Sequence, residues 1–120
     1  MKKTLAPLVL AVVGCIGSIA STSGSAAAAE VVGNPKAAAA KIEMCIGCHG
    51  IPGYKSAFPE VYQVPMIGGQ SAKYIEAALH AYKKGERKHP SMRGIAASLS
   101  DQDIADVAAY YSQQTAQNRK

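Results

Sequence analysis

The chain has 120 residues, with 13 Lys and Arg against 8 Asp and Glu, which gives a formal net charge of +5. This length has room for one domain. The charge is modest, and no run of Lys and Arg with interleaved aromatic residues occurs, so the composition gives no argument for a nucleic-acid partner.

Residues 1–29 have the three parts of a secretory signal peptide. Two lysines form a basic start, an apolar run follows from Leu5 to about Ala20, and a small-residue site ends at Ala29. We therefore expect cleavage after Ala29, a mature domain of residues 30–120 and export to the periplasm. The apolar run is too short, and too interrupted by glycine and proline, to predict a membrane span.

Cys15 opens an alternative to cleavage after Ala29. Val12-Val13-Gly14-Cys15 resembles a bacterial lipoprotein box, in which the cysteine becomes the lipidated first residue and anchors the protein. The downstream small-residue site favours cleavage there, which removes Cys15. The mature domain then contains two cysteines, Cys45 and Cys48.

A first helix is predicted from Pro35. Asn34 is a favourable N-cap residue, proline is common at the first helical position, and KAAAAKIEM continues with strong helix formers. We expect this helix to end between Met44 and Cys48.

A long connection follows at residues 50–69, GIPGYKSAFPEVYQVPMIGG. It contains three prolines and four glycines without periodicity. We predict a loop, and a loop of this length needs something to pack on. The part at 51–64 has no role that the pattern indicates.

A second helix is predicted over SAKYIEAALHAYKK, with Ser71 as its cap and Gly85 as its stop. Ile75, Ala78, Leu79 and Tyr82 recur at helical spacing and form one apolar face. We predict that this face is buried.

A third helix is predicted to begin at Ser100. Ser100 and Asp103 have the spacing of a capping box, and Leu99 and Ile104 have that of a hydrophobic staple. The buried face is expected to consist of Ile104, Val107, Ala108 and Tyr111. Three short helices with one Phe and no Trp bury little surface, so an apolar group from outside the sequence is expected to fill the middle.

The motif CIGCH, residues 45–49, has three interpretations. A zinc site needs about four ligands, but beyond this motif the mature chain offers only His80 and His89. A thioredoxin-like disulfide motif opens a helix after a strand, whereas this motif closes one. The third is covalent haem attachment, in which both thiols add to haem vinyl groups and the adjacent histidine faces the iron. Export and the thin core favour haem.

Four segments together resemble the small bacterial class I c-type cytochromes, whose domains also occur doubled in dihaem periplasmic carriers. They are CIGCHG at 45–50, VPMIGGQ at 64–70, YKKGERKHPSMRGIAASL at 82–99 and LSDQDIADVAAYYS at 99–112. The resemblance implies an all-α class I cytochrome c fold. In this fold three main helices surround one covalently bound haem, and the first and last helices cross.

The resemblance also implies the remaining site residues. Cys45 and Cys48 correspond to the haem thioethers, His49 to the iron ligand, and Pro65 to the residue whose carbonyl orients that histidine. Position leaves Met66 and Met92 as candidates for the sixth ligand, and Met92 lies where the family carries its axial methionine. The family position that Met66 occupies here is usually polar.

These residues predict a one-electron carrier without a substrate site, not an enzyme by itself. Its expected partners are redox proteins that dock at the haem edge. Two alternatives stay open: a haem c subunit of a fixed oxidoreductase complex, in which the 51–64 segment is an interface, and a five-coordinate sensor or peroxidase-like protein, in which Met92 only fills the core.

Overall fold

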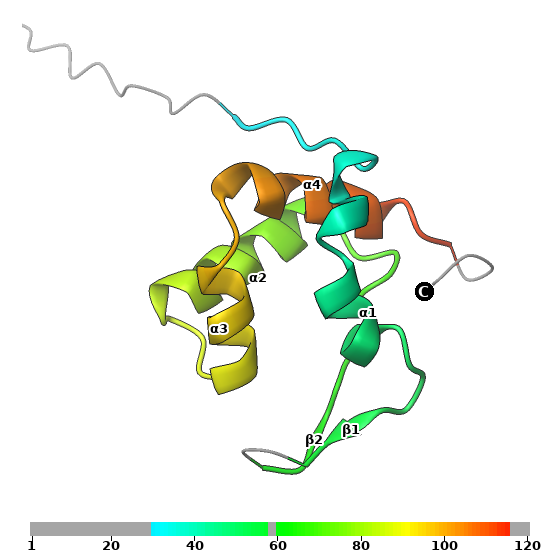
Figure 1. Ribbon diagram of the computed structural model, residues 1–120, viewed down its shortest axis with the longest axis vertical. Coiled ribbons are helices and arrows are strands. Elements are labelled where there is room, and N and C mark those ends of the chain that lie inside the picture. The colour runs from blue at the N-terminus through cyan, green and yellow to red at the C-terminus, as the bar shows by residue number, and fades with distance from the viewer. Residues whose placement is uncertain (1–29, 58–59, 116–120) are drawn as a thin grey trace, which may run out of the picture.

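The computed structural model describes residues 30–57 and 60–115, and the signal-peptide prediction with Cys15 lies outside them. Helices dominate this part of the chain, and Figure 1 shows them grouped together with a small hairpin at one end. In chain order the elements are η1 (Ala37–Ala40), α1 (Glu43–His49), β1 (Lys55–Ser56), β2 (Tyr62–Gln63), α2 (Ala72–Lys84), α3 (Pro90–Ala97) and α4 (Asp101–Ser112). Among the described residues, no helix is long and apolar enough to cross a membrane.

The first predicted helix is divided in two. A turn of 3-10 helix, η1, is separated by a short break at 41–42 from the α-helix α1, which carries both cysteines and ends at His49. Ala38 is fully buried, and η1 packs against α4. The small alanine side chain allows this close approach, as the crossing of first and last helices requires.

The helix α2 confirms the second prediction. The Ser71 side chain accepts a hydrogen bond from the backbone N–H of Tyr74, and Gly85 ends the helix in the left-handed conformation with φ of 80°. Of the predicted apolar face, Ile75 and Leu79 are buried, whereas Ala78 and Tyr82 are only partly buried.

The helix α3 lies between the second and third predicted helices and was not predicted from the sequence. It begins at Pro90, which favours a first helical position because proline lacks the N–H that is unpaired there. Its N-cap residue His89 makes no side-chain capping bond. The helix has eight residues and one buried residue, Ala96. A segment this short has too few turns to show a clear apolar period.

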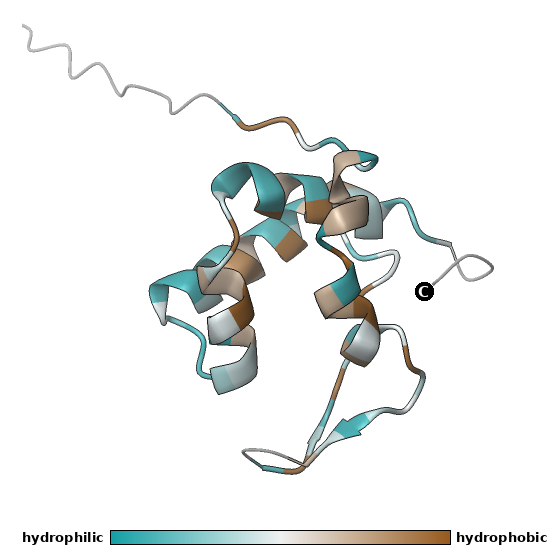
Figure 2. Cartoon of the chain, viewed as in Figure 1, coloured by the Kyte–Doolittle hydropathy of each residue, from teal (hydrophilic) through white to brown (hydrophobic). Residues whose placement is uncertain are grey.

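The helix α4 confirms the third prediction and forms the centre of the fold. Both hydrogen bonds of the capping box between Ser100 and Asp103 are present. All four residues of the predicted face, Ile104, Val107, Ala108 and Tyr111, are buried. Figure 2 shows hydrophilic residues along the outer surface of this helix and hydrophobic ones toward its neighbours.

The N-terminal segment before η1 lies along α4. The backbone N–H of Asn34 donates to the Asp106 carboxylate at 2.7 Å, and the Gln102 amide donates to the Val32 carbonyl at 3.0 Å. A β-carbon on Gly33 would lie 2.2 Å from the Ala105 carbonyl oxygen, so this close approach requires glycine.

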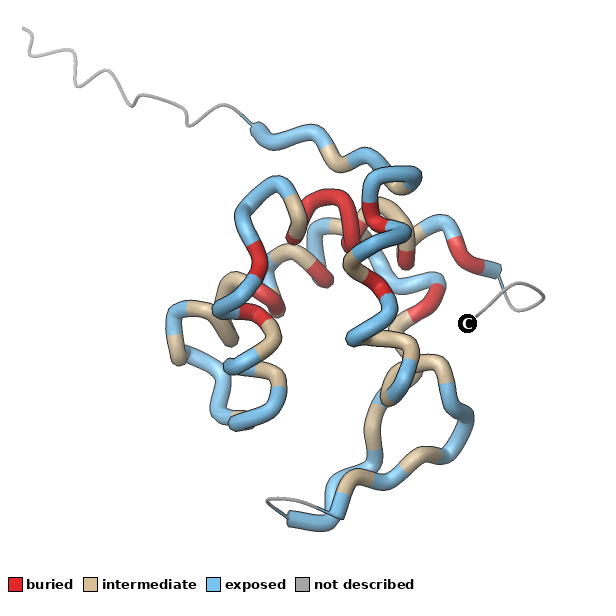
Figure 3. Tube along the Cα trace, in the orientation of Figure 1, coloured by how far each residue is buried: buried red, intermediate tan, exposed pale blue. Residues whose placement is uncertain are grey.

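The predicted loop at 50–69 contains a short antiparallel pair, β1 with β2, in which Lys55 faces Gln63 and Ser56 faces Tyr62. Figure 3 shows exposed and intermediate residues along it, whereas buried residues gather among the helices. Val61 is 76% exposed. This hairpin therefore adds little to the core.

Asp103 predicts a stability change at acid pH. Hydrogen bonds from Ser100, with the Lys41 ammonium 3.0 Å away, lower the pKa of Asp103 from its ordinary 3.8 to about 2. A lowered folded-state pKa stabilises the protein above the unfolded value, and this contribution is lost as pH falls from 3.8 to about 2. In urea titrations, Asp103→Asn should lower the midpoint at neutral pH, and the deficit should shrink through this range.

Glu43→Gln is the matched control, because Glu43 is exposed and forms no ion pair among the described residues. It should leave the midpoint almost unchanged. A deficit of Asp103→Asn that stayed constant down to pH 2 would contradict the assignment.

Candidate functional site

A largely apolar cavity lies between α1, α2, α3 and the segment that joins β2 to α2. Its volume is about 210 Å³. The walls include Met44, Cys45, Cys48 and His49 from α1, residues 64–67, Ile75, Leu79 and Tyr82 from α2, and Met92 and Ile95 from α3. The predicted apolar face of α2 therefore borders this cavity.

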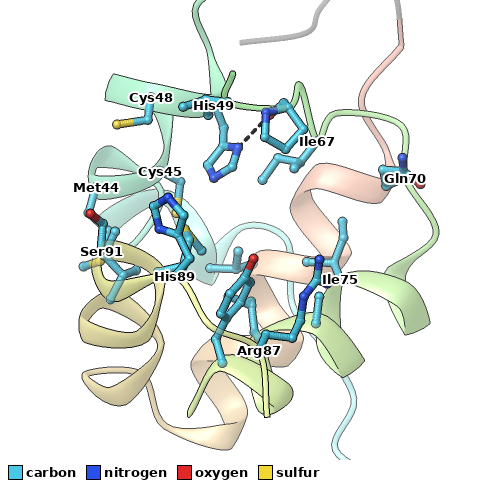
Figure 4. A pocket seen from close by; sticks show the side chains of 18 of the residues that line it. Met44, Cys45, Cys48, His49, Ile67, Gln70, Ile75, Arg87, His89 and Ser91 are labelled. Carbon is cyan, nitrogen blue, oxygen red and sulfur yellow. Dashed lines mark hydrogen bonds between the residues drawn. The ribbon is translucent and has the colours of Figure 1, made fainter. Parts of the chain in front are cut away.

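Cys45 and Cys48 enter the cavity wall from α1, and Figure 4 shows them with His49 on the same side. Both thiols are free. Burial raises the pKa of the Cys45 thiol, an effect that contact with Tyr111 opposes. A redox-active thiol needs the opposite shift. No group of three His, Cys, Asp or Glu side chains that could hold a metal ion occurs in the described ranges. The disulfide-exchange and zinc interpretations therefore gain no support.

His49 is held by one backbone contact in an orientation suited to metal binding. Its Nδ1 lies 2.7 Å from the Pro65 carbonyl oxygen, and Figure 4 shows this bond with the ring standing in the cavity. A carbonyl oxygen only accepts hydrogen bonds, so the proton is on Nδ1. The Nε2 lone pair is therefore free to bind a metal, and the Pro65 contact fixes the ring, as in many metal-ligating histidines.

Polar and aromatic side chains line another part of the cavity. The Arg87 guanidinium lies 4.8 Å from the centroid of the Tyr82 ring, and the His89 ring meets Tyr62 edge-on at 5.2 Å. Figure 4 shows Arg87 away from Cys48 and His49, and draws the His89 ring next to Cys45. The cavity thus offers a cation on the side away from Cys48 and His49, and a further imidazole beside Cys45.

Three methionines border the cavity: Met44, Met66 and Met92. Met44 precedes Cys45 on the same helix, and Met66 follows Pro65, whose carbonyl holds His49. Met92 comes from the separate helix α3 and is partly buried against the core.

Residues 36–115 match the protein family described as cytochrome c. The chain belongs to the cytochrome c family. Its cofactor is haem c, bound covalently, and the protein carries electrons. The all-α class I cytochrome c fold expected from the sequence is confirmed, with α3 as a helix beyond the three predicted.

Cytochromes of several bacteria resemble the chain. It is 45% identical over 85 residues to cytochrome c-554(548) of Halomonas halodenitrificans, an alignment that covers 68% of this chain and 98% of that protein. It is 36% identical over 97 residues to cytochrome c4 of Pseudomonas aeruginosa, covering 81% of this chain and 46% of that one. The chain thus spans about half of cytochrome c4, in keeping with a domain that also occurs doubled.

A third relative is named for its redox partner. The thiosulfate dehydrogenase electron acceptor of Stutzerimonas stutzeri is 35% identical over 74 residues, covering 59% of this chain and 32% of that protein.

The residues at the cavity fit a haem. Two thiols and an imidazole with a free Nε2 share one wall, the surrounding side chains are mainly apolar, and donors lie elsewhere on the rim. All five residues that the sequence singled out, Cys45, Cys48, His49, Pro65 and Met92, border this one cavity.

Sequence reasoning missed the contributions of Tyr62, Arg87 and His89 to the cavity. The only signal for His89 was the proline that follows it, which places it at the start of α3, three residues before Met92.

Proposed function

We propose that the protein is a periplasmic one-electron carrier whose haem is attached through Cys45 and Cys48 and ligated by His49 and Met92. The observation that carries this proposal is the 2.7 Å contact between His49 Nδ1 and the Pro65 carbonyl. It gives the histidine beside the two cysteines a fixed ring and a free Nε2 within an apolar cavity.

The bound iron would supply the chemistry, by cycling between its ferrous and ferric states. The side chains of the chain hold and shield it. Ile75, Leu79 and Ile95 present apolar surface that excludes water, while Arg87 and His89 supply groups that can hold the haem carboxylates. Because both proposed ligands, His49 and Met92, come from packed helices, the geometry of the site should change little on electron transfer. Electron transfer also requires no binding position for a substrate. This supports a carrier, not an enzyme.

Met92 is the better candidate for the second residue that would bind the iron. Met44 and Met66 belong to the chain segments that carry Cys45 and hold His49, so both come from the part of the cavity wall that already supplies His49. Met92 reaches the cavity from α3. A thioether ligand favours ferrous iron and raises the reduction potential, which suits an electron acceptor.

The ligand assignment predicts an optical change. The oxidised holoprotein should show the weak long-wavelength absorption band of methionine bound to ferric iron, and Met92→Ala should abolish it because the sulfur is removed. Met66→Ala is the control, since it removes a cavity methionine on the His49 side, and should keep the band. Retention of the band in Met92→Ala, or ready binding of carbon monoxide by the native ferrous protein, would contradict six-coordinate His/Met ligation.

A fixed complex is a second candidate, because the hairpin exposes apolar surface. Val61 is 76% exposed, and Tyr62 and Ile51 are 46% exposed. Such surface suits contact with a partner protein. Under this alternative the same haem site receives electrons from a dehydrogenase, as the name of one relative indicates for that protein. Recovery of the protein as a free soluble species from the periplasm would argue against it.

Export and the domain boundary are part of the proposal. Removal of residues 1–29 would deliver residues 30–120 to the compartment where c-type haem is commonly attached. Mass spectrometry of the purified protein should give a chain that begins at Glu30 and carries one haem. A lipidated chain that begins at Cys15 would replace the free carrier with a membrane-anchored one, and a chain without haem would refute the attachment.

A further inference from the structure

Tyr111 in α4 has a buried hydroxyl that the proposed haem site does not use. The side chain is fully buried and is among the largest in the core. Its ring meets that of Tyr110 edge-on at 5.2 Å. The hydroxyl oxygen makes no well-formed hydrogen bond within the part of the chain that the structure describes. Buried polar groups are nearly always paired, so this one requires an explanation.

The Cys45 side chain packs against the buried cluster to which Tyr111 belongs, and its thiol interacts with this hydroxyl. Burial raises the pKa of Tyr111, and Cys45 raises it further. Conversely, the contact with Tyr111 lowers the pKa of Cys45, against the effect of burial. Cys45 is partly buried against the core on one side and borders the cavity on the other. The cysteine therefore stands between Tyr111 and the cavity.

The bonding of the sulfur changes when a thioether forms. In the free thiol, Cys45 Sγ lies 4.0 Å from the Lys41 carbonyl oxygen, toward which the S–H can donate. A thioether has no S–H and can only accept. A tyrosine hydroxyl with a raised pKa keeps its proton at neutral pH and is then the donor beside that sulfur.

We propose that Tyr111 is a positioning residue for haem attachment, because its hydroxyl donates a hydrogen bond to the Cys45 sulfur and holds that sulfur at the cavity wall. The inference rests on the proposed attachment of haem at Cys45. It explains why a tyrosine, not a purely apolar residue, occupies a fully buried position of α4 next to the motif.

The test compares Tyr111→Phe with Tyr110→Phe in the holoprotein. Tyr111→Phe removes one oxygen and keeps the ring that packs in the core. Tyr110→Phe removes the hydroxyl of the neighbouring, less buried ring and is the matched control. Resonance Raman spectra of the ferrous protein in H₂O and D₂O would follow the carbon–sulfur stretching bands, and urea titrations would follow stability.

We expect one carbon–sulfur band of the native protein and of Tyr110→Phe to shift in D₂O, and this shift to disappear in Tyr111→Phe. Loss of a formed hydrogen bond should also reduce the equilibrium constant for folding of Tyr111→Phe roughly fivefold. If the hydroxyl were unpaired in the holoprotein, removing it would leave stability unchanged or raised.

Bands insensitive to D₂O in the native protein, or a raised urea midpoint in Tyr111→Phe, would overturn the inference. Peptide mass analysis of the same samples separates this result from a failure of the proposed function. Haem attached at Cys45 with no effect of Tyr111→Phe refutes only the role of Tyr111, whereas absence of haem from Cys45 refutes both.

Discussion

The structure depends on covering the apolar side chains that line the cavity, because the chain itself leaves them uncovered. The largest fully buried side chains of the described core are Tyr111, Ile104 and Val107, and the rest of the buried core is made of small or aliphatic residues. Ile75 and Leu79 belong to this core and also line the cavity. Covering such surface is the main favourable term in folding, and a small domain has little of it to spare. Haem would supply the missing apolar surface, so binding the cofactor would also complete the core.

The helix α4 connects the segments that form the cavity walls. Lys41 pairs with Asp103 at its first turn, and Lys83 at the end of α2 pairs with Asp101 and donates to the Leu99 carbonyl. At the other end the Tyr111 carbonyl accepts from the backbone N–H of Gly69, just before α2. Exposed ion pairs contribute little individually. Their value here is geometric, because each joins α4 to a segment that carries part of the cavity.

The parts of the fold with local signals were predictable from the sequence. Ser71, Gly85 and the Ser100–Asp103 box mark the ends of α2 and α4, and these helices are long enough to show an apolar period. The eight-residue α3 has no side-chain cap and was not predicted. In the site, the spacing of CIGCH brought the cysteines and His49 together. The contact of Cys45 with Tyr111 joins residues far apart in sequence, and no pattern within the chain reveals it.

The central claim is that one haem both completes the core and forms the electron-carrying site. It is tested most directly by two-dimensional amide NMR of the mature chain with Cys45→Ala, Cys48→Ala and His49→Ala together, compared with the holoprotein. Without the groups that hold haem, the chain should give a poorly dispersed spectrum and no cooperative urea transition, because the walls around the cavity stay uncovered. A well-dispersed spectrum with a cooperative transition in the haem-free variant would contradict the account.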